Sequence, residues 1–498
     1  MAIQKINEPV ANVLMNSMRS MGYTFEAAIA DIVDNSISAK AERIDIKFPV
    51  DPGHIYVAIC DDGSGMDSDE LFDAMKYGSE KKKNGRSTDD LGRYGLGLKS
   101  ASLSQCRKLT VISKKDGRYS AYSWDLDVIE KEEEWLVLEY SDNEITELVF
   151  YDYLDNKNSG TVVIWENFDF LEKNTGDVYL GLAKLEEPLS HHLELVFHRF
   201  MSRKDDKKVD IWIDNYKLVP LDPFLENHKK TNIRRKINIA VEDSNGIERT
   251  VVAQPFILPF QKDMSKEDKV LVGGTEDYRT KQGFYIYRNE RLIIWGTWFG
   301  RHKDELTKHA RIRVDIPNTL DDIWCLDVKK QSASIPSSIK RQLTRAVDEA
   351  MDIAMKVQTY RGTTANKDKN PIWNRIVDEH NECYRYEINR DSKIFELIKN
   401  DVDDTTWNKI EMVLEEIEST VPFQQIYIDK SQNKITDSPV EESERVEEIR
   451  TKAKMLLNIT KSVNPDISDK DAIENIFSSE PFNKFSEIKD EMLKGYCA

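Results

Sequence analysis

The sequence has few cysteines, and they are not grouped. The five thiols, at Cys60, Cys106, Cys325, Cys383 and Cys497, stand far apart without any CxxC spacing. Structural zinc sites and disulfide frameworks both need patterned cysteines, so neither is predicted. Isolated thiols favour a reducing interior as the setting of the chain.

Long apolar runs are also missing. The N-terminal stretch "MAIQKINEPV" lacks the basic and then apolar order of a signal segment. No apolar run approaches the ~18 residues that a membrane helix needs. We therefore expect a soluble cytoplasmic protein with no membrane partner.

Positive charge is in deficit, with 71 basic against 89 acidic residues and a net charge of -18. This balance argues against indiscriminate wrapping of nucleic acid but allows a local basic face. The densest basic cluster lies in "HKKTNIRRKIN" and comprises Lys229, Lys230, Arg234, Arg235 and Lys236. Two interpretations stay open: a solvated loop, or a patch that binds DNA phosphates with a steep dependence on salt.

Apolar periodicity is present and predicts an α+β layer, with helices over a mostly antiparallel sheet that ends near residue 170. Strand-like alternation occurs over residues 44–48 and 54–60, and helical spacing precedes and follows these strands. Thr24 is a plausible N-cap of the first of these helices, and Asp67 opens a capping-box-like start for the second. Asp116-Gly117 suits a type I′ hairpin turn.

The chain is long enough for more than one domain. A helical pattern near residue 180 leads into a second strand-rich region that begins at "VDIWIDNYK". Beyond it, "SSIKRQLTRAVDEAMDIAMKVQTY" predicts an amphipathic helix, "RGTTANKDKNP" a polar linker and "DDTTWNKIEMVLEEIEST" a further helix. We predict domains at residues 1–175 and 180–345, followed by a mainly helical region, 346–498, of unknown role.

Four short motifs carry the chemistry. In "DIVDN", Asp31 and Asn35 are four residues apart on a predicted helix and so project from nearly the same face. "DDGSGM" (Asp61 to Met66) directly follows a strand, where glycines let a flat ligand approach and a carboxylate accepts its proton-donating edge. Later in the chain, "SGTVV" places Thr161 at the start of another strand.

The remaining motif, "GRYGLGLKS" (Gly92 to Ser100), looks like a phosphate-binding loop. Leu98 breaks the Walker A spacing, and Ser100 stands where the dinucleotide fingerprint needs a third glycine. The helix predicted to follow would present its N-terminal amides to an anion. The loop by itself therefore leaves its ligand open.

Taken in order, the four motifs resemble those of the GHKL ATPases: gyrase, heat-shock chaperone ATPases, histidine kinases and MutL. The resemblance implies a Bergerat-fold α/β sandwich that binds ATP and Mg²⁺ without a Walker loop. Asn35 would coordinate Mg²⁺ and Asp61 would accept the adenine amino group. The residues implied to line the nucleotide are Gly63, Gly65 and Met66 at the base, Gly92, Gly95, Gly97 and Lys99 at the phosphates, and Thr161 as a support for Asp61. The segment 78–90 would be the ATP lid.

One position departs from this family. Most of these ATPases with a second, transducer domain carry glutamate as the general base, whereas this chain has Asp31, which is shorter by one methylene. A base must reach its proton within about 2.6 to 3.2 Å or through one water. We expect Asp31 to be the base still, with a closer helix, a second water or slow turnover as the consequence.

The second region resembles the transducer domain, ribosomal-S5-like in fold, of MORC-type and MutL-type ATPases. The resemblance is carried by "YIYRNERLI", "ARIRVDIP" and "WCLDVKKQSASIP", and overall it spans about residues 15–345, closest to prokaryotic MORC-like proteins. It implies a lysine that senses the γ-phosphate, which we assign to Lys330 with Lys329 as the alternative. Arg288 and Arg291 are interpreted as family scaffold rather than as site residues.

The resemblance implies an ATPase that works as a conformational clamp. ATP would drive dimerisation of two N-terminal domains, and the clamp would act on DNA in a prokaryotic defence or restriction-associated system, with operon-encoded protein partners. Two alternatives stay open: a chaperone-like ATPase with protein clients, and a nucleotide-binding scaffold with little hydrolysis. The transducer-like region argues against a histidine kinase, and the lack of a metal-ligand cluster argues against a nuclease.

Overall fold

The computed structural model divides the chain into two compact units, residues 1–358 and 359–498. It describes residues 10–20, 22–76, 97–274, 278–303, 307–321, 339, 342–344, 347–348, 371–378, 383–426, 442–479 and 481–496. No helix within these ranges is both long and apolar enough to cross a membrane.

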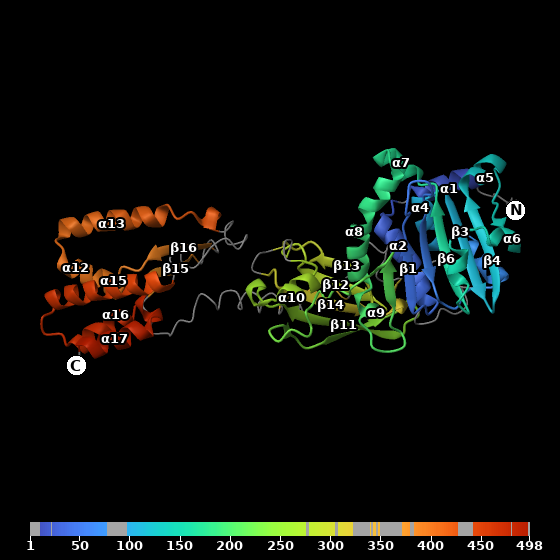
Figure 1. The fold of residues 1–498 in the computed structure, drawn as a ribbon. Coiled ribbons are helices and arrows are strands. Elements are labelled where there is room, and N and C mark those ends of the chain that lie inside the picture. The colour runs from blue at the N-terminus through green and yellow to red at the C-terminus, as the bar shows by residue number, and fades with distance from the viewer. Residues whose placement is uncertain are drawn as a thin grey trace, which may run out of the picture. The chain divides into compact units, whose positions relative to one another are not determined.

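An eight-stranded sheet forms the N-terminal part of the first unit (Figure 1), in the order β5-β4-β3-β6-β2-β1-β7-β8. All neighbouring strands in it are antiparallel except β1 and β7. The predicted α+β layer with a mostly antiparallel sheet is thus confirmed. The strands are β1 (Arg43–Lys47), β2 (Val57–Asp61), β3 (Lys108–Lys115), β4 (Arg118–Asp125), β5 (Leu138–Glu139), β6 (Gly160–Glu166), β7 (Asp210–Ile213) and β8 (Tyr216–Lys217).

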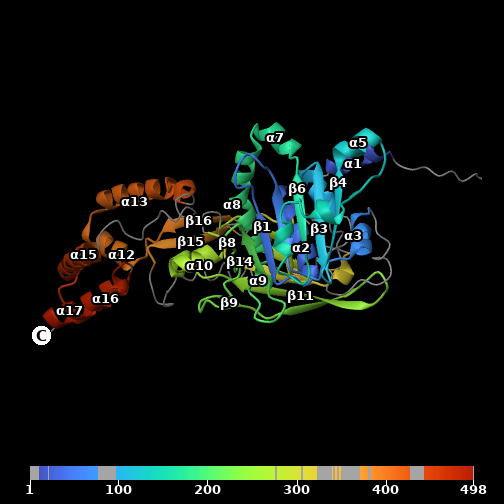
Figure 2. The same ribbon diagram turned by 45° about the vertical axis from the view of Figure 1, so that its right-hand side comes forward.

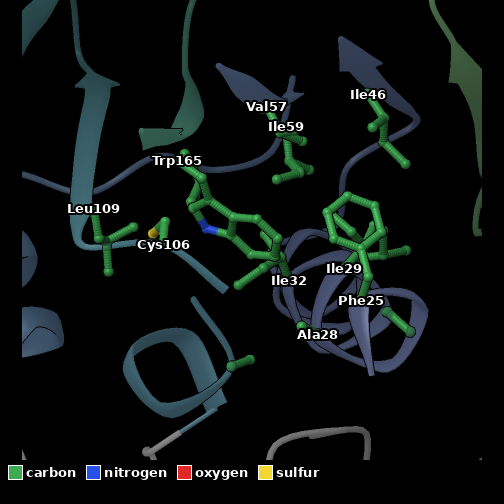
Figure 3. Close-up of a cluster of buried hydrophobic side chains, with 14 of the residues drawn as sticks. Phe25, Ala28, Ile29, Ile32, Ile46, Val57, Ile59, Cys106, Leu109 and Trp165 are labelled. Carbon is green, nitrogen blue, oxygen red and sulfur yellow. The ribbon is translucent and has the colours of Figure 1, made fainter. Parts of the chain in front are cut away.

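Helices cover one face of this sheet and enclose the largest apolar core, while α6 and η2 pack on the other face. Figures 1 and 2 show α2 and α8 against the strands, and Figure 3 shows Trp165 of β6 among α2 side chains, edge-on to Phe25 at 6.0 Å. Burial of this apolar face is what holds α2, the helix with the first motif, in place. The helices are α1 (Ala11–Arg19), α2 (Phe25–Ser38), α3 (Ser68–Met75), α4 (Gly97–Gln105), α5 (Leu126–Glu132), α6 (Asp142–Ile145), η2 (Tyr151–Leu154), α7 (Asp169–Thr175), α8 (Val178–Val196) and α9 (His198–Met201).

Local signals in the sequence form as predicted. Thr24 caps α2 by accepting a hydrogen bond from the Ala27 amide at 3.3 Å, and Asp67 opens α3 with a complete capping box. The β3–β4 hairpin turns at Asp116 and Gly117, whose φ angles of 51° and 76° are the two positive values that a type I′ turn requires.

A second sheet in the same unit has the order β10-β11-β14-β12-β13, with β9 beside β11. Its strands enclose a separate apolar core. The elements are β9 (Asn232–Ile233), β10 (Ile237–Glu242), β11 (Glu248–Ile257), η3 (Gln261–Asp263), α10 (Lys266–Leu271), β12 (Gly283–Arg288), β13 (Arg291–Thr297), β14 (Ala310–Ile316) and η4 (Asn318–Leu320).

The strand in "VDIWIDNYK" corrects one expectation. We expected it to open the second strand-rich region, but β7 pairs in parallel with β1 of the first sheet, Ile211 opposite Ile44 and Ile213 opposite Ile46. The physical reason is that both of its isoleucines are buried in the core that α2 and α8 cover. The segment therefore completes the first sheet, and the domain boundaries stay predictions.

The second unit is mostly helical and has its own apolar core. The helix expected over "DDTTWNKIEMVLEEIEST" is present as α13, whereas the hairpin of β15 and β16 was not predicted. The elements are β15 (Trp373–Asp378), β16 (Cys383–Ile388), α12 (Lys393–Asp401), α13 (Asp404–Ser419), α15 (Glu442–Val463), α16 (Asp469–Phe477), η5 (Phe482–Lys484) and α17 (Ser486–Tyr496).

Candidate functional site

The first motif lies on the polar side of α2. Asp31 is buried, while Asn35, one turn later, is exposed. The Tyr23 hydroxyl donates to Asp31 Oδ2 at 3.2 Å. A Cβ built on Gly97, the first residue of α4, would lie 3.7 Å from the same Asp31 oxygen. The structure thus brings the predicted base, the predicted Mg²⁺ ligand and the end of the glycine loop to one place.

A cation from the second sheet also reaches this helix. Arg291 at the start of β13 places Nε 2.8 Å from Oδ1 and 2.7 Å from Oδ2 of Asp34, and Nη2 3.7 Å from Oδ1 of Asp31. All three side chains are at most 6% exposed. Sequence reasoning did not connect Arg291 with Asp34 and Asp31. The available signal was a pair of acids three residues apart within the apolar stretch "AAIADIVD", a pattern that calls for a cation.

The second motif ends β2 with a buried carboxylate. Asp61 accepts the Ser36 hydroxyl on Oδ2 at 2.7 Å, and on Oδ1 the amides of Gly63 at 2.9 Å and Thr161 at 3.2 Å. Burial raises the pKa of Asp61 to about 6, although these hydrogen bonds oppose the rise. The three groups that donate to this carboxylate are one hydroxyl and two backbone amides. None of these three contacts brings a positive charge to it.

The turn after Asp61 is built for glycine. Gly65 has φ +64°, and a Cβ there would come within 1.9 Å of the Lys114 carbonyl oxygen. At Gly63 a Cβ would lie 2.9 Å from Ala39, at the C-terminus of α2. The turn therefore lies in close contact with the end of α2 at Gly63 and with β3 at Gly65. A larger residue at either position would push the backbone of the turn away from that element.

Thr161 and Met66 meet around one serine. The Thr161 and Ser113 hydroxyls lie 3.0 Å apart, and the Met66 amide donates to Ser113 Oγ at 2.9 Å. The link from Thr161 to Asp61 runs through its backbone amide rather than through its side chain. Ser113, which sequence reasoning missed, is fully buried and holds the turn against β6.

Lys99 is buried, and its ammonium donates to the carbonyls of Ala74 at 2.8 Å and Lys76 at 2.5 Å. It therefore joins the end of α3 to the start of α4. The other predicted phosphate and sensor residues, Gly92, Gly95, Lys329 and Lys330, lie outside the described residues, as does the segment 78–90.

The predicted basic cluster surrounds β9. Its lysines and Arg235 are exposed, Arg234 is half-buried, and Lys230 forms an ion pair with Asp263 at 2.9 Å. A cavity of about 430 Å³ beside it is lined by Lys229 and Lys230 but also by Asp263 and Asp268. The surface is thus of mixed charge, and at least one of its five cations is already engaged.

The described residues fit a nucleotide and Mg²⁺. The uncompensated acceptor at Asp61 suits the amino edge of adenine, and the exposed amide of Asn35 is a suitable oxygen ligand. Within the described ranges no group of three His, Cys, Asp or Glu side chains could hold a metal by itself.

Comparison with known proteins places this region among the GHKL ATPases. Residues 23–161 match the family described as "Histidine kinase-, DNA gyrase B-, and HSP90-like ATPase". The chain is 34% identical to ATPase morc-1 of Caenorhabditis elegans over 114 residues, 22% of this chain and 13% of that protein. It is 35% identical to ATPase MORC2 of Homo sapiens over 92 residues, 18% and 9% of the two chains.

It is also 33% identical to the DNA mismatch repair protein MutL of Rhodospirillum rubrum over 98 residues, 20% of this chain and 15% of that one. Each match thus spans less than a sixth of the relative's length. Residues 23–161 form a GHKL ATPase domain related to those of MORC ATPases and MutL.

Proposed function

We propose that this chain is a Mg²⁺-dependent ATPase that works as a MORC-like conformational clamp. The observation that carries the proposal is the position of Asp31, buried against the first residue of α4 and one turn from the exposed Asn35. A base, a metal ligand and the end of a glycine loop then share one site. These are the groups that phosphoryl transfer to water needs.

Each side chain has a separate task in this mechanism. Asp61 accepts a hydrogen bond from the adenine edge, and Gly63 and Gly65 let the base approach the backbone. Asn35 would hold Mg²⁺, which would neutralise charge on the phosphates. Asp31 takes the proton of the attacking water. Its shorter side chain leaves a gap to that water, so we expect slow turnover.

The clamp itself is inferred from the relatives. ATP favours a closed state only to the extent that it binds that state better. We propose that this state is a dimer of N-terminal domains, and that Lys330 or Lys329 senses the γ-phosphate. One of the relatives is named a DNA mismatch repair protein, which together with the basic cluster supports action on DNA. A prokaryotic defence system, with operon-encoded partners, is the proposed setting.

Light scattering tests the clamp. The solution mass is measured without nucleotide and with Mg²⁺ plus a non-hydrolysable ATP analogue. We expect a shift from monomer to dimer in the wild type and in Ser38→Ala, a change at an exposed position of the same helix. Asn35→Ala is expected to abolish the shift. An unchanged mass despite nucleotide binding would refute the clamp and favour the scaffold.

A salt titration tests the DNA proposal. Replacing all five residues of the basic cluster by glutamine is expected to weaken DNA binding and to flatten its dependence on salt, by about one unit of slope for each phosphate that is no longer neutralised. Lys230 already pairs with Asp263, so the expected change is at most about four units. An unchanged slope would remove the cluster from the DNA interface, and stimulation of turnover by unfolded protein alone would favour a chaperone-like role.

A further inference from the structure

The contact between Arg291 and α2 joins the two sheets of the first unit. Arg291 belongs to β13 of the second sheet, and Asp34 to the helix that covers the first. Its Nε contacts both Asp34 oxygens, its Nη2 lies 3.7 Å from Asp31, and its Nη1 donates to the carbonyl of Leu292 at 3.2 Å. One guanidinium thus faces two carboxylates and its own strand at once.

We propose that Arg291 is a positioning residue for Asp31 in ATP hydrolysis. The inference rests on the proposed function, in which Asp31 takes a proton from water. Asp31 and Asp34 are both buried and lie one turn apart, so their negative charges repel in a medium of low dielectric constant. The guanidinium contacts Asp34 and faces Asp31, so its positive charge offsets that repulsion.

Arg291 also fixes the direction of the Asp31 carboxylate. Tyr23 donates to Oδ2 and Arg291 approaches Oδ1, so the two oxygens are held from different elements. The side that carries Oδ2 faces Gly97. Without Arg291, the Oδ1 side of Asp31 would lose its cation, and the carboxylate could rotate away from the end of the glycine loop.

The surroundings hold the guanidinium itself in place. Its carbon lies 5.6 Å from the centre of the Phe197 ring. Burial, and then the charge of Arg291, lower the pKa of the nearby His192 to about 4, so this imidazole is neutral at physiological pH and adds no second cation. A lysine at position 291 would keep the charge but not the fork that reaches three partners.

A purely structural role is the competing explanation, and the chain offers a matched control for it. Arg288 ends β12 and forms a buried ion pair with Asp321, with Nε–Oδ1 and Nη2–Oδ2 both at 2.6 Å. Both residues of this pair belong to the second sheet and the 3₁₀ turn after it. Losing either arginine takes a cation away from a buried carboxylate, but of the two arginines only Arg291 faces Asp31.

The experiment compares Arg291→Gln, Arg291→Lys and Arg288→Gln in the full chain. For each folded variant, the affinity for a non-hydrolysable ATP analogue is measured together with kcat and KM. We expect Arg291→Gln to lower kcat by roughly 30-fold or more, part of the 10²–10⁴-fold that a positioned base supplies, with affinity changed by no more than about threefold. Arg291→Lys should recover part of kcat, and Arg288→Gln should keep it within about twofold.

Other outcomes have fixed meanings. If kcat falls equally in Arg291→Gln and Arg288→Gln, or in neither, the inference is overturned while the proposed function stands. A wild-type chain that binds the analogue but releases no phosphate from ATP overturns both. If Arg291→Gln does not fold, Arg291→Lys decides, because it keeps the charge but not the planar fork, and a kcat equal to that of the wild type there refutes the inference.

Discussion

Replacing Asp61 by asparagine should make the protein more stable and weaken its binding of nucleotide. The wild-type carboxylate is buried, and burial raises its pKa from 3.8 to about 6. That shift corresponds to about 3 kcal/mol of destabilisation at pH 7, at 1.36 kcal/mol per pKa unit. The asparagine amide can replace the existing contacts, since Oδ1 accepts the amides of Gly63 and Thr161 and Nδ2 donates to Ser36 Oγ, whose proton can turn to the Ile32 carbonyl.

The sign of the effect sets its pH dependence. An acid whose pKa is higher in the folded state binds protons more tightly there, so ionisation costs stability as pH rises above 3.8, and the full cost is reached above about 6. The variant should therefore gain little at pH 4, gain progressively up to about pH 6, and keep a constant advantage of up to about 3 kcal/mol above that.

Urea denaturation at several pH values measures this advantage, and Asp45→Asn is the matched control. Burial acts to raise the pKa of Asp45, but hydrogen bonds from Arg43 and Tyr153 outweigh it and hold that pKa below its usual value. The ionised form of Asp45 therefore stabilises the fold at neutral pH, and Asp45→Asn should lose stability there. Nucleotide affinity of Asp61→Asn should fall roughly 10- to 100-fold because the charged acceptor is gone. A variant less stable than the wild type at pH 7, or a difference that does not change with pH, would refute the reasoning.

Three further predictions concern the same site. Gly65→Ala should lower the free energy of unfolding by about 2–4 kcal/mol because its Cβ would meet the Lys114 carbonyl oxygen, whereas Gly117→Ala, also at positive φ but with nothing within 4 Å, should cost about 1 kcal/mol in the same urea titration. Asp31→Asn should keep nucleotide binding and lose about 100-fold or more in phosphate release, and an intact rate would disprove its role as base. Lys99→Met should destabilise by about 1–3 kcal/mol through two carbonyls left without their donor, and a neutral result would contradict that link between helices.

Elements fixed by neighbouring residues could be predicted from the sequence. The Thr24 cap, the Asp67 capping box and the Asp116-Gly117 turn each depend on chemistry within four residues, so the pattern contains all the information that is needed. Asp31 and Asn35 belong to the same class, since helical spacing alone puts them one turn apart.

Contacts between distant segments could not be predicted in this way. Asp34 and Arg291 are 257 positions apart, and neither has a local pattern that names the other. The contacts of Ser113 could not be predicted either, because it lies within a strand, and the pattern of a strand indicates which side chains are buried but not which groups they contact. Apolar periodicity predicts that β7 is a strand but does not indicate which sheet it joins, so its pairing with β1 could not be predicted.

The parallel pairing of β7 with β1 has a consequence for how the chain can be divided. A fragment that stops at residue 175, the predicted end of the ATPase domain, would lack α8 and β7. Ile44 and Ile46 would then lie on an open sheet edge, ready to pair with another molecule, and part of the apolar surface under α8 would face water. The first sheet thus runs on to Lys217, and the chain adds its last two strands only after the long helix α8 has crossed the sheet.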